Sequence, residues 1–96
     1  MVNLYRRGRI AEKKVANLLK DEGYINIRRS AGSRGPADLY ARKGDNKYYI
    51  QVKTGSAKAS PREIRRLRGL ARERGGTAVV AHYKRGKKKL RFYGHW

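Results

Sequence analysis

Two helix-forming segments that bracket a run of β-forming residues place the strongest constraint on the fold of this chain. The first, Arg9 to Glu22, has apolar residues at helical spacing, and Gly23 follows it as a stop. The second begins at Ser60-Pro61-Arg62-Glu63, which supplies an N-cap, a proline at the first helical position and a capping-box glutamate. Its apolar residues form one stripe, and Gly75-Gly76 ends it. We therefore expect two helices, each with one buried face.

The other regular segments are short and rich in residues that favour strands. Gly44-Asp45-Asn46 separates two of them as a hairpin turn, which predicts that these two strands pair antiparallel. Ala31 to Pro36 is a loop by composition. The expected strands are Tyr24 to Arg29, Ala37 to Arg42, Lys47 to Thr54, Thr77 to Tyr83 and, after a basic turn at Lys84 to Lys88, Lys89 to Tyr93. The predicted order is α-β-β-β-α-β-β.

The length and charge of the chain limit the classes of protein that it can represent. Its 96 residues suffice for one domain, residues 1–96, with a modest core. Lys and Arg number 26 against seven Asp and Glu, and the formal net charge of +19 favours a polyanionic partner such as nucleic acid. A histone-like or ribosomal protein would satisfy the same charge. The chemistry must therefore be read from individual residues.

Cysteine usage and hydropathy suggest the compartment. The absence of cysteine excludes a disulfide framework and a thiolate zinc site, and is compatible with a reducing compartment. There is no apolar run of the roughly 20 residues that a membrane-spanning helix needs. We expect a cytoplasmic protein that does not enter the membrane.

The scarcity of acidic residues makes each one informative. Five of the seven have ordinary structural explanations as helix-end, turn, capping or ion-pairing residues: Asp21, Glu22, Asp45, Glu63 and Glu73. The two that remain are Glu12, near the edge of the buried face of the first helix, and Asp38, at the start of a strand after a glycine-rich loop. These two carboxylates are the candidates for chemistry.

A third segment provides partners for these carboxylates. Gln51 and Lys53 point to the same face of their strand, and the predicted hairpin brings Asp38 close to both. The first helix can place Glu12 over the same cleft. Two carboxylates, the Gln51 amide oxygen and a strand carbonyl at Val52 form an oxygen set that suits Mg²⁺, for which Mn²⁺ can substitute. A neighbouring lysine can stabilise developing phosphorane charge or orient an attacking water.

Each of these residues also has a plainer interpretation. Glu12 can be a solvated helix residue that pairs with a nearby cation. Asp38 can simply accept hydrogen bonds from loop amides. Gln51 and Lys53 are ordinary residues for an exposed strand. Their joint occurrence in one predicted cleft is the argument for a metal-dependent nuclease site.

The sequence resembles the PD-(D/E)XK nuclease superfamily, and within it the archaeal Holliday junction resolvases. The resemblance rests on several segments in matching order along nearly the whole chain: Arg6-Arg7-Gly8-Arg9 before the helix with Glu12, Arg28-Arg29-Ser30-Ala31-Gly32-Ser33, Gly35-Pro36-Ala37-Asp38, Gln51-Val52-Lys53 and Arg74-Gly75-Gly76. It implies a restriction-endonuclease-like α/β fold with a mixed central sheet flanked by two helices. It also implies a homodimer that resolves four-way DNA junctions by phosphodiester hydrolysis.

The resemblance also assigns roles to residues. It makes Glu12, Asp38, Gln51 and Lys53 the catalytic set, with Ser33 or Ser30 as an assisting hydroxyl. DNA contacts are expected from basic and loop residues: Arg6, Arg7, Arg9, Arg29, Ser30, Arg34 and Lys58. Gln51 departs from the family pattern, because an acidic residue usually stands there. The loss of one negative charge should weaken metal affinity.

Two other functions remain open. One is a related nuclease that nicks or trims other DNA and still depends on Glu12, Asp38 and Lys53. The other is an inactive, basic DNA-binding protein, for which Gln51 is the best argument.

Overall fold

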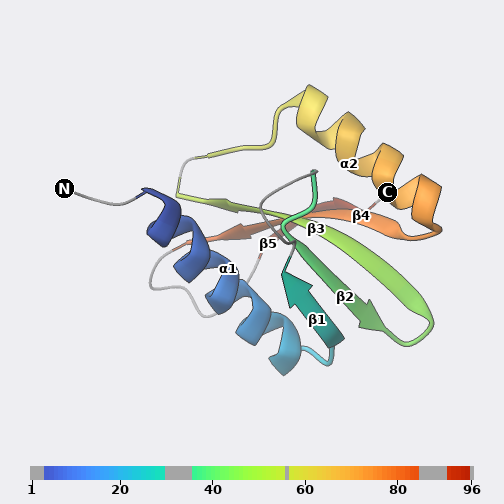
Figure 1. The fold of residues 1–96 in the computed structure, drawn as a ribbon, viewed down its shortest axis with the longest axis horizontal. Coiled ribbons are helices and arrows are strands. Elements are labelled where there is room, and N and C mark those ends of the chain that lie inside the picture. Colours follow the sequence, from blue (N-terminus) through green and yellow to red (C-terminus); the bar gives the residue numbers. More distant parts are fainter. Residues whose placement is uncertain (1–3, 30–35, 56, 85–90, 96) are drawn as a thin grey trace.

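A five-stranded sheet carries one helix on each face (Figure 1). This is a computed structural model, and it describes residues 4–29, 36–55, 57–84 and 91–95. The elements are α1 (Leu4–Asp21), β1 (Ile25–Arg29), β2 (Leu39–Lys43), β3 (Asn46–Thr54), α2 (Pro61–Arg74), β4 (Thr77–Tyr83) and β5 (Arg91–His95). The predicted order of elements and the mixed sheet are confirmed.

The strands follow one another across the sheet in chain order, β1-β2-β3-β4-β5. All neighbours are antiparallel except β3 and β4, which run parallel with Gln51 beside Val80. A parallel pair needs a crossover connection, and α2 supplies it. The hairpin between β2 and β3 pairs Leu39 with Ile50 at its far end, so the start of β2 lies beside the middle of β3.

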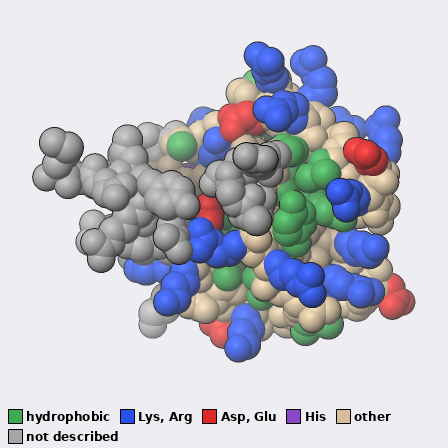
Figure 2. All heavy atoms as spheres, viewed as in Figure 1, with side chains coloured by type: hydrophobic (Ala, Val, Ile, Leu, Met, Phe, Trp, Pro, Cys, Tyr) green, Lys and Arg blue, Asp and Glu red, His purple; other side chains and the backbone are tan. Residues whose placement is uncertain are grey.

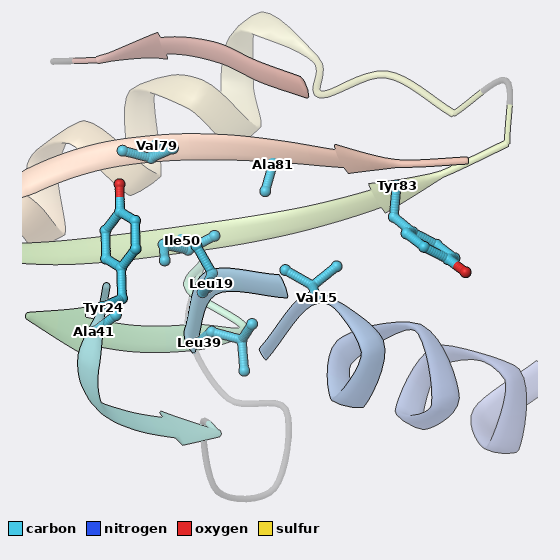
Figure 3. Close-up of a cluster of buried hydrophobic side chains, with 9 residues drawn as sticks. All are labelled: Val15, Leu19, Tyr24, Leu39, Ala41, Ile50, Val79, Ala81 and Tyr83. Atoms are coloured by element: carbon cyan, nitrogen blue, oxygen red, sulfur yellow. The ribbon is translucent and has the colours of Figure 1, made fainter. Parts of the chain in front are cut away.

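One hydrophobic core lies between α1 and the sheet (Figure 3). Val15 and Leu19 of α1 are fully buried against Leu39, Ile50 and Val79 of the three central strands. Burial of an aliphatic side chain of this size contributes about 1.5–3 kcal/mol. This core therefore fixes the position of α1 over the middle of the sheet.

A smaller core lies between α2 and the opposite face of the sheet. Leu67 and Ala71 of α2 pack with Ala78 and Val80 of β4. The predicted capping box is present, since Ser60 accepts a hydrogen bond from the Glu63 amide and Glu63 accepts one from the Ser60 amide. The helix ends at Gly75, whose φ of 72° is left-handed. Because α2 packs mainly on β3 and β4, it covers only part of its face of the sheet.

Several boundaries differ from the sequence-based expectation. The first helix begins at Leu4 rather than Arg9, because arginine favours helices well enough to extend one beyond its apolar stripe. The last strand spans Arg91–His95 rather than Lys89 to Tyr93, and residues 85–90 lie outside the described residues. In β1 the register shifts between Ile25 and Arg28, and Asn26 has a φ of 52°. Neither helix of the described chain has the length and apolar character needed to cross a membrane.

Candidate active site

Asp38 is fixed at the start of β2 by the backbone of β3. Its amide donates a hydrogen bond to the Ile50 carbonyl at 2.8 Å, and its Oδ2 accepts one from the Val52 amide at 2.8 Å. The predicted hairpin therefore does bring Asp38 beside the segment that contains Gln51 and Lys53. One carboxylate oxygen is held by the backbone, which fixes the orientation of the group.

The environment of Asp38 disfavours its ionised form. Burial raises the pKa of this carboxyl, and the nearby carboxylates of Glu12 and Glu63 raise it further. The Val52 amide and the Lys53 ammonium act in the opposite direction and lower the pKa, but the net shift is upward. A half-buried carboxyl with two other acids nearby gains electrostatic stabilisation when a cation binds beside it.

Gln51, Lys53 and Glu63 form a connected polar cluster at the end of β3. Gln51 Nε2 donates a hydrogen bond to Glu63 Oε2 at 2.7 Å. Lys53 Nζ donates to the same oxygen, also at 2.7 Å, and forms an ion pair with it. Glu63, in the first turn of α2, therefore contacts both of these β3 side chains.

Glu63 stays ionised well into the acidic range. The Lys53 ammonium and the Ser60 amide, which both donate hydrogen bonds to its carboxylate, lower the pKa of Glu63 to about 2. The capping box fixes one carboxylate oxygen at the start of α2, which leaves the other for the β3 side chains. A formal negative charge therefore lies beside Gln51 at neutral pH.

The amide of Gln51 has a defined orientation. Its side chain is 8% exposed, and its nitrogen must face Glu63 because a carboxylate can only accept a hydrogen bond. The amide oxygen, Oε1, is buried and has no hydrogen-bond partner among the described residues. A buried oxygen without a partner costs about 1–3 kcal/mol, which a cation or a donor at this position would recover.

These observations fit an oxygen-ligated divalent ion. Asp38, Gln51 Oε1 and the backbone carbonyl of Val52 are hard donors of the kind that Mg²⁺ prefers. Among the described residues, no three His, Cys, Asp or Glu side chains converge closely enough to hold a metal by themselves. An ion here would therefore depend on amide and backbone oxygens, and on water or phosphate.

Glu12 lies within electrostatic range of Asp38 but is already paired. Its Oε2 lies 3.1 Å from Arg29 Nε, a contact that joins α1 to the end of β1. The side chain of Arg29 is 42% exposed, so this ion pair is screened by water and contributes little to stability. Both interpretations of Glu12 therefore have support, as a helix residue paired with a cation and as a third acid that faces Asp38.

The other predicted residues are placed less fully. Arg6, Arg7 and Arg9 lie on α1, but the structure does not describe their side chains. Ser30, Ser33 and Arg34 lie outside the described residues. Lys58 is exposed before α2 and, together with Lys53, lines a small cavity of about 300 Å³.

Sequence reasoning missed the contribution of Glu63. Its role as a capping residue was predicted and is present, but that explanation removed it from the candidate set. The signal that would have recovered it is its position in the first turn of a crossover helix, which starts above the end of β3. Gln51 is a second signal, because an amide at a position where the family usually has an acidic residue suggests a carboxylate on a neighbouring element.

Comparisons with known proteins identify the family. Residues 7–84 match the model of the Mrr catalytic domain, described as restriction endonuclease. This match covers most of the chain, and the protein belongs to this restriction endonuclease family. The chain is thus a nuclease with a restriction-endonuclease-like fold. No curated protein matches the sequence.

A solved structure supports the same conclusion. The fold is similar to that of Hjc, a Holliday junction resolvase from the archaeal hyperthermophile Archaeoglobus fulgidus, with a TM-score of 0.76 and 27% sequence identity. The match covers 91% of this chain and 71% of the Hjc chain. The resemblance to archaeal resolvases noted in the sequence is therefore confirmed at the level of the fold.

Proposed function

We propose that this protein is a metal-dependent DNA endonuclease that cuts four-way junctions. The observation that carries the proposal is the convergence of Asp38, Gln51 and Lys53 at the β2–β3 hairpin, with a buried amide oxygen that lacks a partner in the part of the chain that the structure describes. The similarity to an archaeal Holliday junction resolvase supports the choice of substrate. The net charge of +19 supports binding to a polyanion where several duplex arms meet.

The side chains have distinct proposed roles. Asp38, Gln51 Oε1 and the Val52 carbonyl would hold Mg²⁺ or Mn²⁺, with Glu12 as an outer acid. Bound there, the ion would lower the pKa of water and polarise the scissile phosphate. Lys53 presents its ammonium to the charge that develops on the phosphate. Glu63 is a positioning residue, because it holds Lys53 and fixes the orientation of the Gln51 amide. The products would carry 5′-phosphate and 3′-hydroxyl ends.

A four-way junction is approximately two-fold symmetric. A two-fold homodimer with one site in each subunit would match that symmetry and could cut both strands. We propose this assembly, and a cytoplasmic location beside the DNA, as part of the same function. Loop serines at 30 and 33 would assist, and the basic residues of α1 and the loop, with Arg29 and Lys58, would contact phosphates.

The test is cleavage of a labelled synthetic junction and of a linear duplex of matched sequence. Each is incubated with Mg²⁺, with Mn²⁺ or with a chelator. Symmetric, metal-dependent cuts in the junction alone support the proposal. Cutting of both substrates instead indicates a nuclease of broader specificity.

A second function is favoured by one observation. The Gln51 amide is neutral and its nitrogen is committed to Glu63, so the cluster carries less charge for a metal than a paired carboxylate would. A DNA-binding protein without activity would bind the junction tightly and leave it intact in both metals across pH. That result would refute the nuclease proposal.

A further inference from the structure

A groove with basic walls lies on the face of the sheet that α2 covers only in part. Its volume is about 570 Å³, and it runs between α2 and the strands β1 to β3. We call it the basic groove and define it by four cations and two aromatic rings: Arg28, Arg42, Lys47, Arg74, Tyr40 and Tyr49. In Figure 2, hydrophobic side chains form a patch with Lys and Arg side chains to its right and below it.

The charge of the basic groove is uncompensated. None of the described residues that line it is acidic. Arg29 also lies at its edge but is engaged by Glu12, whereas Arg28, Arg42 and Lys47 form no ion pair with another described residue. The same holds for Arg74 on α2. Cations held apart around a concave surface without counter-charges favour a polyanionic ligand.

The floor of the groove is aromatic and held in place. The rings of Tyr40 and Tyr49 meet edge to face, with centroids 5.4 Å apart. Both side chains are half-buried, since one side of each packs on the small core beneath α2. Gly76 lies against the Tyr49 ring, so closely that a Cβ there would lie 2.8 Å from its Cδ2. The rings therefore form a fixed surface rather than a mobile one.

The basic groove lies on the same face of β3 as the Gln51, Lys53 and Glu63 cluster. Alternate residues of a strand share a face, so Tyr49 of β3 lies on the same face as Gln51 and Lys53. The same helix borders both places, because Glu63 of α2 contacts Gln51 and Lys53, and Leu70 and Arg74 further along α2 line the groove. A polymer that placed one phosphate beside Asp38 and followed β2 and β3 away from the site would enter the groove.

We propose that the basic groove binds a single strand of DNA that leaves the active site. Exposed aromatic surface beside spaced cations suits single strands, whose bases can pack on rings while their phosphates meet Lys and Arg. A second copy of the chain is disfavoured, because a two-fold contact would bring four uncompensated cations from each copy together. The proposal rests on the proposed nuclease function for its substrate, and its test is independent of cleavage.

The experiment measures binding without catalysis. The Asp38→Asn protein is titrated in chelator against a fluorescent 12-nucleotide oligo-dT and a 12-base-pair duplex, over a range of salt. A double substitution in the groove, Arg42→Ala with Lys47→Ala, is compared with Arg65→Ala with Arg66→Ala. Both pairs remove two cations, and Arg65 and Arg66 are exposed on α2 outside the groove.

We expect the groove pair to weaken oligo-dT binding at least 10-fold and the control pair to change it less than about threefold. The salt slope should fall by about 1.4 for the groove pair, from two phosphate contacts at about 0.7 each. Equal weakening by both pairs would overturn the proposal, as would a greater loss for duplex than for single strand. If the groove variant changes the molecular mass of the protein in solution, the surface binds a second copy of the chain. That result would also overturn the proposal.

The two proposals can fail separately. If the wild-type protein cuts junctions and the two double variants bind oligo-dT alike, the nuclease proposal stands and the groove assignment is wrong. If nothing is cut and only the groove pair loses affinity for oligo-dT, the groove assignment stands and the nuclease proposal is wrong.

Discussion

Gln51 on β3 donates a hydrogen bond to Glu63 on α2, with 2.7 Å between Nε2 and Oε2. This contact places a carboxylate beside a position where related nucleases usually carry one on the strand itself. The charge that is missing from residue 51 is therefore present on a neighbouring element. Despite the departure of Gln51 from the family pattern, this part of the site therefore contains a carboxylate, whose charge Lys53 balances.

Asp38→Asn tests the central residue of the site. Asn can still accept the hydrogen bond from the Val52 amide, so the fold should persist, whereas the loss of charge should remove metal binding. We expect cleavage to fall at least 100-fold and junction affinity to stay within about threefold, by cleavage and gel-shift assays. Asp45→Asn in the β2–β3 turn is the matched control and should leave both unchanged.

Gln51→Glu tests the relation between residue 51 and Glu63. Two carboxylates in contact repel each other, so the variant should melt at a lower temperature than the wild type in chelator. A divalent ion relieves that repulsion, so added Mg²⁺ should raise its melting temperature more than that of the wild type. Thermal denaturation with and without Mg²⁺ measures both effects, and equal responses to Mg²⁺ would contradict the predicted site.

The pKa of Glu63 predicts how stability responds to acid. Its folded-state pKa, about 2, lies below the unfolded value near 4.5, so its contribution is complete above about pH 4.5 and is lost as the pH falls toward 2. Glu63→Gln should remove this part of the acid dependence. Melting temperatures between pH 2 and 7 should converge for variant and wild type at the acid end. Glu73→Gln, at the exposed end of α2, should leave the curve unchanged.

The raised pKa of Asp38 predicts how the cleavage rate falls at low pH, the acid limb of the pH profile. A protonated carboxyl binds a metal poorly, so cleavage should fall as the pH drops through a value above that of an ordinary aspartate. The sign for stability is opposite to that of Glu63, because protonation of Asp38 relieves an unfavourable buried charge. Higher Mg²⁺ should move the limb to lower pH. A limb that does not shift with Mg²⁺ would mean that another group controls it.

Gly76→Ala tests the close approach of the backbone to Tyr49. An added methyl group would lie 2.9 Å from the Lys47 carbonyl oxygen and against the Tyr49 ring, so we expect a loss of about 1–3 kcal/mol. Gly69→Ala is the control, because its Cβ would meet nothing within 4 Å and alanine favours the helix by about 0.5–1 kcal/mol. Urea denaturation should therefore show changes of opposite sign.

Sequence reasoning recovered the order of elements because hydrophobic period, turn residues and caps act locally. It also placed Asp38 beside Gln51 and Lys53, since a hairpin turn fixes which strand ends meet. It could not place Glu63, because the direction in which a crossover helix returns depends on the packing of Leu67 and Ala71 against β4. For the same reason, the sequence does not predict that α2 covers only part of its face of the sheet. That coverage depends on where the helix packs and not on the helix sequence alone.

The parallel pairing of β3 with β4 has a consequence for how activity is lost. Asp38 precedes this pair in the chain and Glu63 lies in the connection between its strands, so Glu63 reaches Lys53 only after the crossover has closed. Opening of the crossover separates the first turn of α2 from β3 before any strand of the hairpin need part. Partly unfolded molecules would then lack the contact that positions Lys53 and Gln51, so we expect them to cut DNA poorly rather than indiscriminately.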